Sequence, residues 1–346
     1  MDNFLLDSLV DPVDKTPLRV AGNILKSSSG RNYPIVEGIP IMLVEGIDQT
    51  IGAGERTLHV AHKEVIDNDP WYLDTTTMGD QNIAELKIRL SAGSQFSIDP
   101  VISYLIGATS GHLFAQLVGK LKKYPIPNIR LFPTGSPYSR LMLDIGCNWG
   151  RWSISAAKKG YNVIGIDPSL GAVLAGRRAA EQIGVSVHWL VGDARYLPFR
   201  DNSFEQAFSY SVIQHFSKPN TKKVLSEVGR VLANAGTSLI QMPNAFGVRS
   251  FYHLLRRRFR EAKGFEVRYY TPTELLEMFE LNIGPSNLSV DGFFGLGIQS
   301  SDKDFMPFKH KALIRASEVL RQFSQMVPFL KFCADSLYVE SKKVVQ

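Results

Sequence analysis

Short apolar runs recur along the second half of the chain, and several of them end in an acidic residue. A run of four to eight mostly apolar residues bounded by polar residues or glycine is typical of a buried strand. The predicted strands are Leu141–Asp144, Gly160–Asp167, Ser186–Ala194, Asn202–Phe216 (which runs on into a loop), Thr237–Met242, Ser286–Phe293 and Asp335–Glu340.

Segments of helical periodicity fill the intervals between these strands. Thr221–Asn234 carries its apolar residues on one helical face. Thr271 followed by Pro272 is a typical helix start, because threonine caps a helix and proline suits its first position. Pro307–Ala334 predicts further helices before the last strand. Strands that alternate with helices predict an α/β fold.

We expect three parts along the chain: residues 1–46, residues 47–136 and residues 137–346. In the middle part, residues 45–80 are polar, with glycine and proline, and are expected to form a linker. Asn82–Leu90 and Pro100–Tyr124 are expected to be helices that cover the α/β part.

The segment that begins Leu-Met-Leu-Asp144-Ile-Gly146-Cys-Asn148-Trp-Gly150 predicts a strand, a tight glycine turn and a helix start. Glycine lets a ligand approach bare backbone, and ligands of open α/β sheets bind at such strand ends. Asp167 ends the next strand, 21 positions after Gly146. A carboxylate at that distance suits a ribose diol, and the spacing alone leaves NAD and S-adenosylmethionine both open.

Two further motifs favour S-adenosylmethionine. Gly192-Asp193-Ala194 closes the third strand, and Ser209-Tyr210-Ser211 lies near the end of the fourth. With the glycine turn and Asp167, they make residues 139–344 resemble the Rossmann-like (class I) S-adenosylmethionine-dependent methyltransferases, of the methyltransferase type 11-like group. The resemblance implies a Rossmann-like, seven-stranded, mostly parallel sheet with an antiparallel C-terminal hairpin.

The resemblance also implies roles for individual residues. Asp144, Gly146, Cys147 and Gly150 would line the methionine part of the cofactor, with Asn148 where the family usually has a glycine. Asparagine tolerates left-handed backbone, so the turn can keep its shape. Asp167 would hold the ribose hydroxyls, and Asp193 and Ala194 would hold the adenine. Ser209 and Tyr210 would lie beside the reacting methyl group.

Methyl transfer to a hydroxyl is helped by a general base. His215 is the first candidate and Tyr210 the second. A packing or capping role for His215 is the alternative.

Residues 5–44 resemble the small zinc-ribbon-like domain related to the activator subunit of transfer-RNA methyltransferases, through the motif Tyr33-Pro-Ile-Val-Glu-Gly-Ile-Pro40. Where metal-binding relatives have two Cys-x-x-Cys pairs, this chain has Asp11, Asp14, Lys26 and Ser29. Without thiolates, and with a lysine among the four, these positions cannot form the usual structural zinc site. We therefore expect a small β-rich domain that binds no metal.

Composition is that of an ordinary globular protein, with 44% hydrophobic and 21% charged residues. Two cysteines cannot form a disulfide framework, and the first residues lack a signal-peptide pattern, so we expect a cytoplasmic protein. The formal charge is +6, and residues 249–268 hold seven of the basic residues. Residues 249–260 predict an amphipathic basic helix. It is either a solvated surface helix or a contact for an anionic substrate, a peripheral membrane surface or RNA.

Three function classes remain open at this point. The first is methyl transfer to an oxygen or nitrogen of a small-molecule or lipid- or sugar-linked acceptor. The second is an RNA methyltransferase, although the sequence carries no strong nucleic-acid signal. The third is a non-catalytic methyltransferase-like binding module. The oligomeric state is not indicated.

Overall fold

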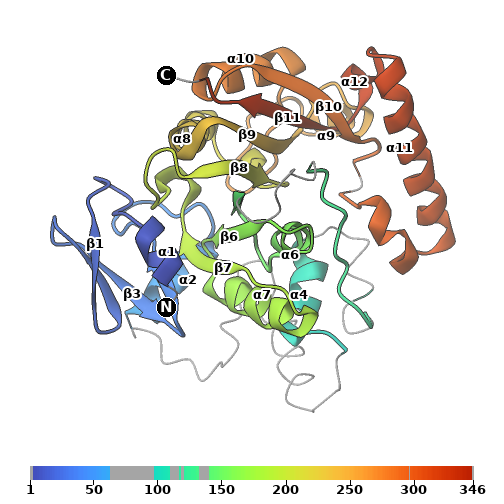
Figure 1. The fold of residues 1–346 in the computed structure, drawn as a ribbon. Helices are drawn as coiled ribbons and strands as arrows, with labels where there is room; N and C mark the ends of the chain where they lie inside the picture. The colour runs from blue at the N-terminus through green and yellow to red at the C-terminus, as the bar shows by residue number, and fades with distance from the viewer. Residues whose placement is uncertain are drawn as a thin grey trace.

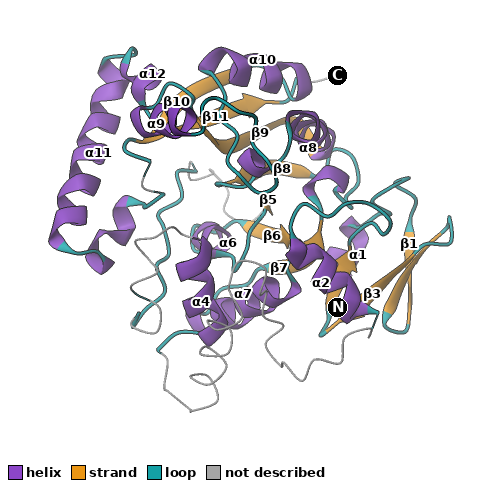
Figure 2. Ribbon diagram, turned by 180° about the vertical axis from the view of Figure 1, so that it is seen from behind, coloured by secondary structure: helices purple, strands orange, loops and turns teal. Residues whose placement is uncertain are grey.

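A computed structural model describes residues 3–62, 97–109, 117, 121–131, 140–295 and 297–344. The predicted helix Asn82–Leu90 lies outside the described residues. Figures 1 and 2 show a single twisted sheet with helices on both of its faces. Among the described residues, no helix is long and apolar enough to cross a membrane.

The predicted strands of the α/β part form one continuous stretch of this sheet, in the order β7-β6-β5-β8-β9-β11-β10. Their bounds are β5 Leu141–Ile145, β6 Asn162–Asp167, β7 His188–Gly192, β8 Phe204–Ser209, β9 Leu232–Pro243, β10 Ser286–Gly292 and β11 Ser336–Lys342. Strands β5 to β9 pair in parallel, and β11 is antiparallel to both β9 and β10. The antiparallel pairing of the last two strands is as predicted.

Helices cover the two faces of the sheet with separate apolar clusters. On one face, α8 Lys218–Val231 and α10 Pro272–Asn282 pack against strand residues such as Leu143 and Ile164. On the other, α4 Pro100–Thr109 and α7 Leu170–Ile183 pack around Trp149 and Val191. Helix α6 Arg151–Ala157 follows the glycine turn, and the predicted cap of α10 is present, because Thr271 and Glu274 form a capping box. The fold is therefore a three-layer α/β/α arrangement.

The sheet is wider than predicted, because the N-terminal segment joins it. After α1 Asn3–Ser8, strands β1 Leu18–Ala21, β2 Ile24–Ser27, β3 Asn32–Val36 and β4 Ile39–Met42 extend the sheet to eleven strands. Strand β4 pairs in parallel with β7 through Ile41 opposite Val191 and Met42 opposite Gly192. The predicted count of seven is therefore wrong for the sheet as a whole. Pairing with β4 covers backbone groups of β7 that would otherwise form an open sheet edge.

Three element bounds also differ from the prediction. Helix α2 Gly52–Ala61 lies where a linker was expected, so Gly52 and Gly54 do not prevent a helix there. Helix α8 ends at Val231, and β9 begins at once. The predicted basic helix is α9 Val248–Arg256. It stops early because Arg258 and Phe259 take left-handed backbone, and their N–H groups donate to carbonyls in its last turn.

The N-terminal positions compared above with cysteine pairs are joined by an arginine. The Arg31 guanidinium donates to Asp11 Oδ2 at 2.8 Å and to Ser29 Oγ at 2.7 Å, and it also pairs with Asp14. Asp11 is fully buried, and the Tyr33 hydroxyl donates to the same oxygen at 3.1 Å. A cation of the chain itself therefore links three of the four positions. The described residues contain no group of three or more His, Cys, Asp or Glu side chains that could hold a metal. The relation to zinc ribbons stays a prediction.

We predict that Arg31→Met lowers the free energy of unfolding by about 2–3 kcal/mol at pH 7, because it leaves the buried Asp11 carboxylate without its cation. Burial alone would raise the pKa of Asp11, but the hydrogen bonds from Arg31 and from backbone N–H groups hold it below its usual value. A depressed folded-state pKa stabilises the fold above the unfolded pKa of about 3.9, and this contribution is lost as pH falls through the folded value. Urea unfolding at pH 7 and pH 3 should therefore show a smaller difference in the free energy of unfolding between wild type and Arg31→Met at pH 3.

Arg19→Met, at an exposed position on β1, is the control. Equal stability of wild type and Arg31→Met at pH 7 would contradict this account.

Candidate active site

The glycine turn between β5 and α6 has the backbone shape expected of it. Gly146, Asn148 and Gly150 all take left-handed conformations, with φ of 71°, 50° and 75°. A Cβ on Gly146 would lie 2.4 Å from Val212 Cγ2, and one on Gly150 would lie 2.2 Å from the Trp189 ring. Both positions therefore require glycine. Asn148 takes the left-handed conformation without being glycine, so the turn keeps its shape.

Three carboxylates lie at or directly after the ends of three adjacent parallel strands. Asp144 of β5 is buried and accepts a hydrogen bond from Ser153 Oγ at 2.5 Å. Asp167 ends β6 and accepts from the backbone N–H groups of Asn148 and Ser169, each at 2.9 Å. Asp193 follows β7 directly. The structure thus places the predicted cofactor carboxylates along one edge of the sheet.

The remaining predicted cofactor residues lie on the same edge. Cys147 is buried in the apolar cluster around Trp149, and burial raises the pKa of its thiol, which disfavours the reactive thiolate. Ala194 begins the short 3-10 helix η1 Ala194–Tyr196. Ser209, at the end of β8, is buried and donates through Oγ to the Ile145 carbonyl at 2.9 Å. This bond ties the fourth strand to the start of the glycine turn.

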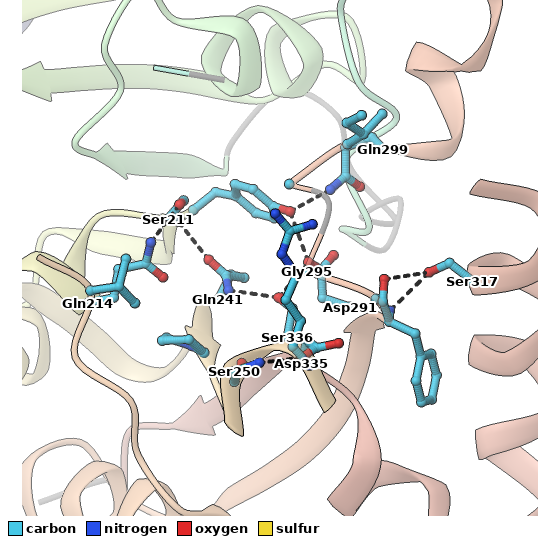
Figure 3. Close-up of a pocket in the computed structure, with 18 of the residues that line it drawn as sticks. Ser211, Gln214, Gln241, Ser250, Asp291, Gly295, Gln299, Ser317, Asp335 and Ser336 are labelled. Atoms are coloured by element: carbon cyan, nitrogen blue, oxygen red, sulfur yellow. Dashed lines mark hydrogen bonds between the residues drawn. The ribbon is translucent and has the colours of Figure 1, made fainter. Parts of the chain in front are cut away.

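A cavity of about 220 Å³ lies beside this edge, between α9 and α11 Phe308–Met326. Tyr210 and Ser211 line it directly after β8, and Gln241 lines it from the end of β9. Figure 3 shows polar side chains that line it, among them Asp291 of β10 and Asp335.

Asp291 is the centre of a hydrogen-bond network in this cavity. Its Oδ2 accepts from the Tyr210 hydroxyl at 2.9 Å and from Ser336 Oγ at 2.8 Å. Gln241 Nε2 donates to Ser336 Oγ at 2.7 Å, and its Oε1 accepts from the Ser211 N–H at 2.8 Å. The network fixes Asp291 with respect to the loop after β8, where the reacting methyl is predicted to lie.

Tyr210 is held as a hydrogen-bond donor. Burial and the neighbouring Asp291 carboxylate raise the pKa of Tyr210 well above its ordinary value. Its hydroxyl also accepts from Gln299 Nε2 at 2.6 Å. A protonated phenol in these contacts positions Asp291, and it is poorly suited to remove a proton.

His215 lies in η2 Ile213–His215, next to the cavity-lining residue Gln214, but it is not itself one of the residues that line the cavity. Its ring stacks on Phe265 at 3.9 Å, and Nδ1 donates to the Phe265 carbonyl at 2.8 Å. Burial lowers the pKa of His215, which keeps the ring neutral near pH 7. These contacts favour the packing role that the sequence left open. The catalytic roles of His215 and Tyr210 stay predictions.

Residues 142–236 match a protein family described as a methyltransferase domain. Ajmaline N-methyltransferase of Rauvolfia serpentina is 33% identical over 105 residues, which cover 29% of this chain and 35% of that protein. Ubiquinone biosynthesis O-methyltransferase of Azorhizobium caulinodans is 29% identical over 107 residues, which cover 31% and 37%. In this region the chain is therefore similar to methyltransferases.

Two further proteins are similar to parts of this chain. Mouse tRNA (carboxymethyluridine(34)-5-O)-methyltransferase ALKBH8 is 27% identical over 184 residues, 52% of this chain and 26% of that protein. The solved structure of Haemonchus contortus phosphoethanolamine N-methyltransferase 2 in complex with S-adenosyl-L-methionine has a TM-score of 0.41 and 19% identity. The similar region covers 60% of this chain and 49% of that one. The chain spans little more than a third of the length of the ajmaline and ubiquinone enzymes.

Asp144 and Asp167, the two carboxylates next to the glycine turn, have the chemistry to hold the methionine and ribose parts of S-adenosylmethionine. Burial raises the pKa of Asp144 to about 7, although the Ser153 hydrogen bond opposes this. A cation nearby, such as the ammonium of the methionine part, would restore its charge. Asp193 differs from the expectation, because the Arg195 guanidinium already donates to it at 2.6 Å. An adenine amine at Asp193 would have to share that carboxylate with Arg195 or displace it.

We predict that Asp167→Ala weakens S-adenosylmethionine binding by roughly 1.5–3 kcal/mol, the usual contribution of hydrogen bonds to a charged group. Titration calorimetry measures this directly. Asp201→Ala is the matched control, because Asp201 is an exposed carboxylate that pairs with Arg230. Equal affinity in wild type and Asp167→Ala, or preferential binding of NAD, would contradict the assignment of Asp167.

Proposed function

We propose that the chain transfers a methyl group from S-adenosylmethionine to an oxygen or nitrogen of a small-molecule or lipid- or sugar-linked acceptor. The observation that carries this proposal is the position of the Asp291 cavity. It begins at Tyr210, one residue after Ser209, and Ser209 is bonded to the β5 end of the glycine turn. A ligand in the cavity would thus lie next to the predicted cofactor edge.

Two buried carboxylate oxygens support a donor-bearing acceptor. Asp291 is 7% exposed and Asp335 is 3% exposed. Asp291 Oδ1 and Asp335 Oδ2 have no hydrogen-bond partner in the part of the chain that the structure describes. A buried polar atom without a partner costs about 1–3 kcal/mol. A hydroxyl or amine of an acceptor in this cavity would supply the missing donor.

For methyl transfer, the protein must mainly align the acceptor with the methyl group and remove the acceptor's proton. When bound, S-adenosylmethionine supplies an already electrophilic methyl group. The cavity residues hold the acceptor beside it and keep water out. Asp291 is our candidate to receive the acceptor proton at Oδ1, while Tyr210 and Ser336 fix Oδ2.

RNA methylation is the second candidate. It is favoured by the match to a tRNA methyltransferase over 52% of this chain and by the basic residues of segment 249–268. The enclosed position of Asp291 and Asp335 favours the small acceptor, since RNA binding relies mainly on exposed positive charge. A non-catalytic methyltransferase-like module is the remaining alternative, and an assay of methyl transfer distinguishes it from both enzymes.

We predict that Asp291→Asn lowers turnover by about 10²–10⁴-fold, the range for loss of a general base, with cofactor affinity near normal. Transfer of labelled methyl should be followed over polyols, phenols, amines and total RNA, with and without RNase. Glu280→Gln, on the exposed side of α10, should retain full turnover.

Full turnover of Asp291→Asn would exclude Asp291 as the base. RNase-sensitive incorporation into RNA would favour the second candidate. Cofactor binding without transfer to any acceptor class would favour the non-catalytic module.

A further inference from the structure

Large exposed apolar side chains are concentrated in two segments near the cavity. Among the described residues, 14 of the 19 large hydrophobic side chains that are strongly exposed lie in residues 246–265 and 308–332. Scattered exposed apolar residues are normal, whereas a concentration of them marks an interaction surface. The first segment contains Phe246, Val248, Phe251, Tyr252, Leu255, Phe259 and Phe265, which are 49–70% exposed.

Helix α9 has two contrasting faces. Arg249, Ser250 and His253 line the cavity. At helical spacing, Phe251 and Leu255 lie on the opposite side, where both are exposed. Asp335 Oδ1 fixes the helix start by accepting from the N–H groups of Arg249 and Ser250, at 2.7 and 2.9 Å. The helix is thus a wall, polar toward the acceptor cavity and apolar toward the outside.

The C-terminal end of α9 carries positive charge without ion-pair partners. Arg256 and Arg258 are exposed, and neither forms an ion pair in the described part of the chain. The nearby Arg260, by contrast, pairs with Glu266 at 2.6 Å. Two free guanidinium groups therefore lie beside Leu255 and Phe259.

The surface continues from α9 onto α12 Leu330–Cys333. Asn244, just before α9, donates through Nδ2 to the carbonyls of Phe332 and Ala334, at 2.9 and 2.8 Å. Phe329 and Phe332 are 69% and 47% exposed. Figures 1 and 2 both place α9 and α12 close together, at the end of the molecule away from β1.

We propose that residues 246–259, together with Phe329 and Phe332, bind an anionic lipid surface; we call this set the α9 surface. Aromatic and aliphatic side chains enter the boundary between headgroups and acyl chains, and arginines beside them attract anionic headgroups. RNA would use the arginines and could stack its bases on the aromatic rings, but it offers no partner to the exposed aliphatic side chains Val248 and Leu255. The charge and the apolar side chains together therefore favour lipid.

This placement deepens the proposed function. The other side of the same helix lines the Asp291 cavity, so an acceptor held in the membrane would meet the cavity at the edge of α9. The inference that the acceptor is lipid-linked rests on the proposed function. Binding to the membrane does not, because it needs neither cofactor nor acceptor.

The test is cosedimentation of the full chain with vesicles, without cofactor. The vesicles are either phosphatidylcholine alone or phosphatidylcholine with 30 mol% phosphatidylglycerol. We expect binding to the anionic vesicles and little to the neutral ones. Each arginine near an anionic surface contributes about 1 kcal/mol, so Arg256→Glu with Arg258→Glu should weaken binding at least about thirtyfold. Phe251→Ser with Leu255→Ser should weaken it at least about tenfold.

Arg19→Glu with Val20→Ser is the matched control, because it makes the same kinds of change at exposed positions on β1. This variant should bind anionic vesicles like the wild type, and circular dichroism should show all variants folded. The charge variant changes only exposed, unpaired side chains, so it remains informative if the apolar variant does not fold.

Absence of binding to anionic vesicles would overturn the proposal. So would equal loss in the β1 control, or α9 variants that bind as the wild type does. Tight, salt-sensitive RNA binding abolished by the arginine variant would assign the surface to RNA, and dimerisation abolished by the apolar variant would assign it to a second copy. Vesicle binding without methyl transfer to any acceptor would leave the α9 surface established and refute the proposed function alone.

Discussion

The site depends on one constraint, which is that β5 to β9 run parallel. Parallel strands end at the same edge of a sheet, and the loops that follow them meet there. The constraint brings Asp144, Asp167 and Asp193 together from three strands, and it sets Tyr210 one strand away. The Ser209 bond to the Ile145 carbonyl joins the cofactor side to the acceptor side. The predicted cofactor site and the proposed acceptor site both depend on that edge.

The features that could be predicted from the sequence have a signal within a few neighbouring residues, or a pattern that recurs along the chain. Apolar runs ending in an acid located the strands and their carboxylates, because the signal lies within a few residues of each position. The capping box at Thr271 is equally local. The left-handed turn at Asn148 was expected because only a few residue types tolerate that conformation.

What could not be predicted depends on contacts between distant residues. Asp291 is 81 residues from Tyr210 and 45 from Ser336, so neither its burial nor its network has a local signature. The one available signal was a carboxylate in an otherwise uncharged strand, Ser286–Gly292. In the same way, the pairing of β4 with β7 joins residues about 150 positions apart. The end of α9 was missed because residues other than glycine rarely take the left-handed turn that closes it.

The most direct test of the central claim is a crystal structure with sinefungin, which carries an amine where S-adenosylmethionine carries its reactive methyl. The account predicts that the ligand lies along the edge formed by Asp144 and Asp167, with its amine pointing past Tyr210 into the Asp291 cavity. An amine that points away from this cavity, or a ligand bound elsewhere on the chain, would contradict it.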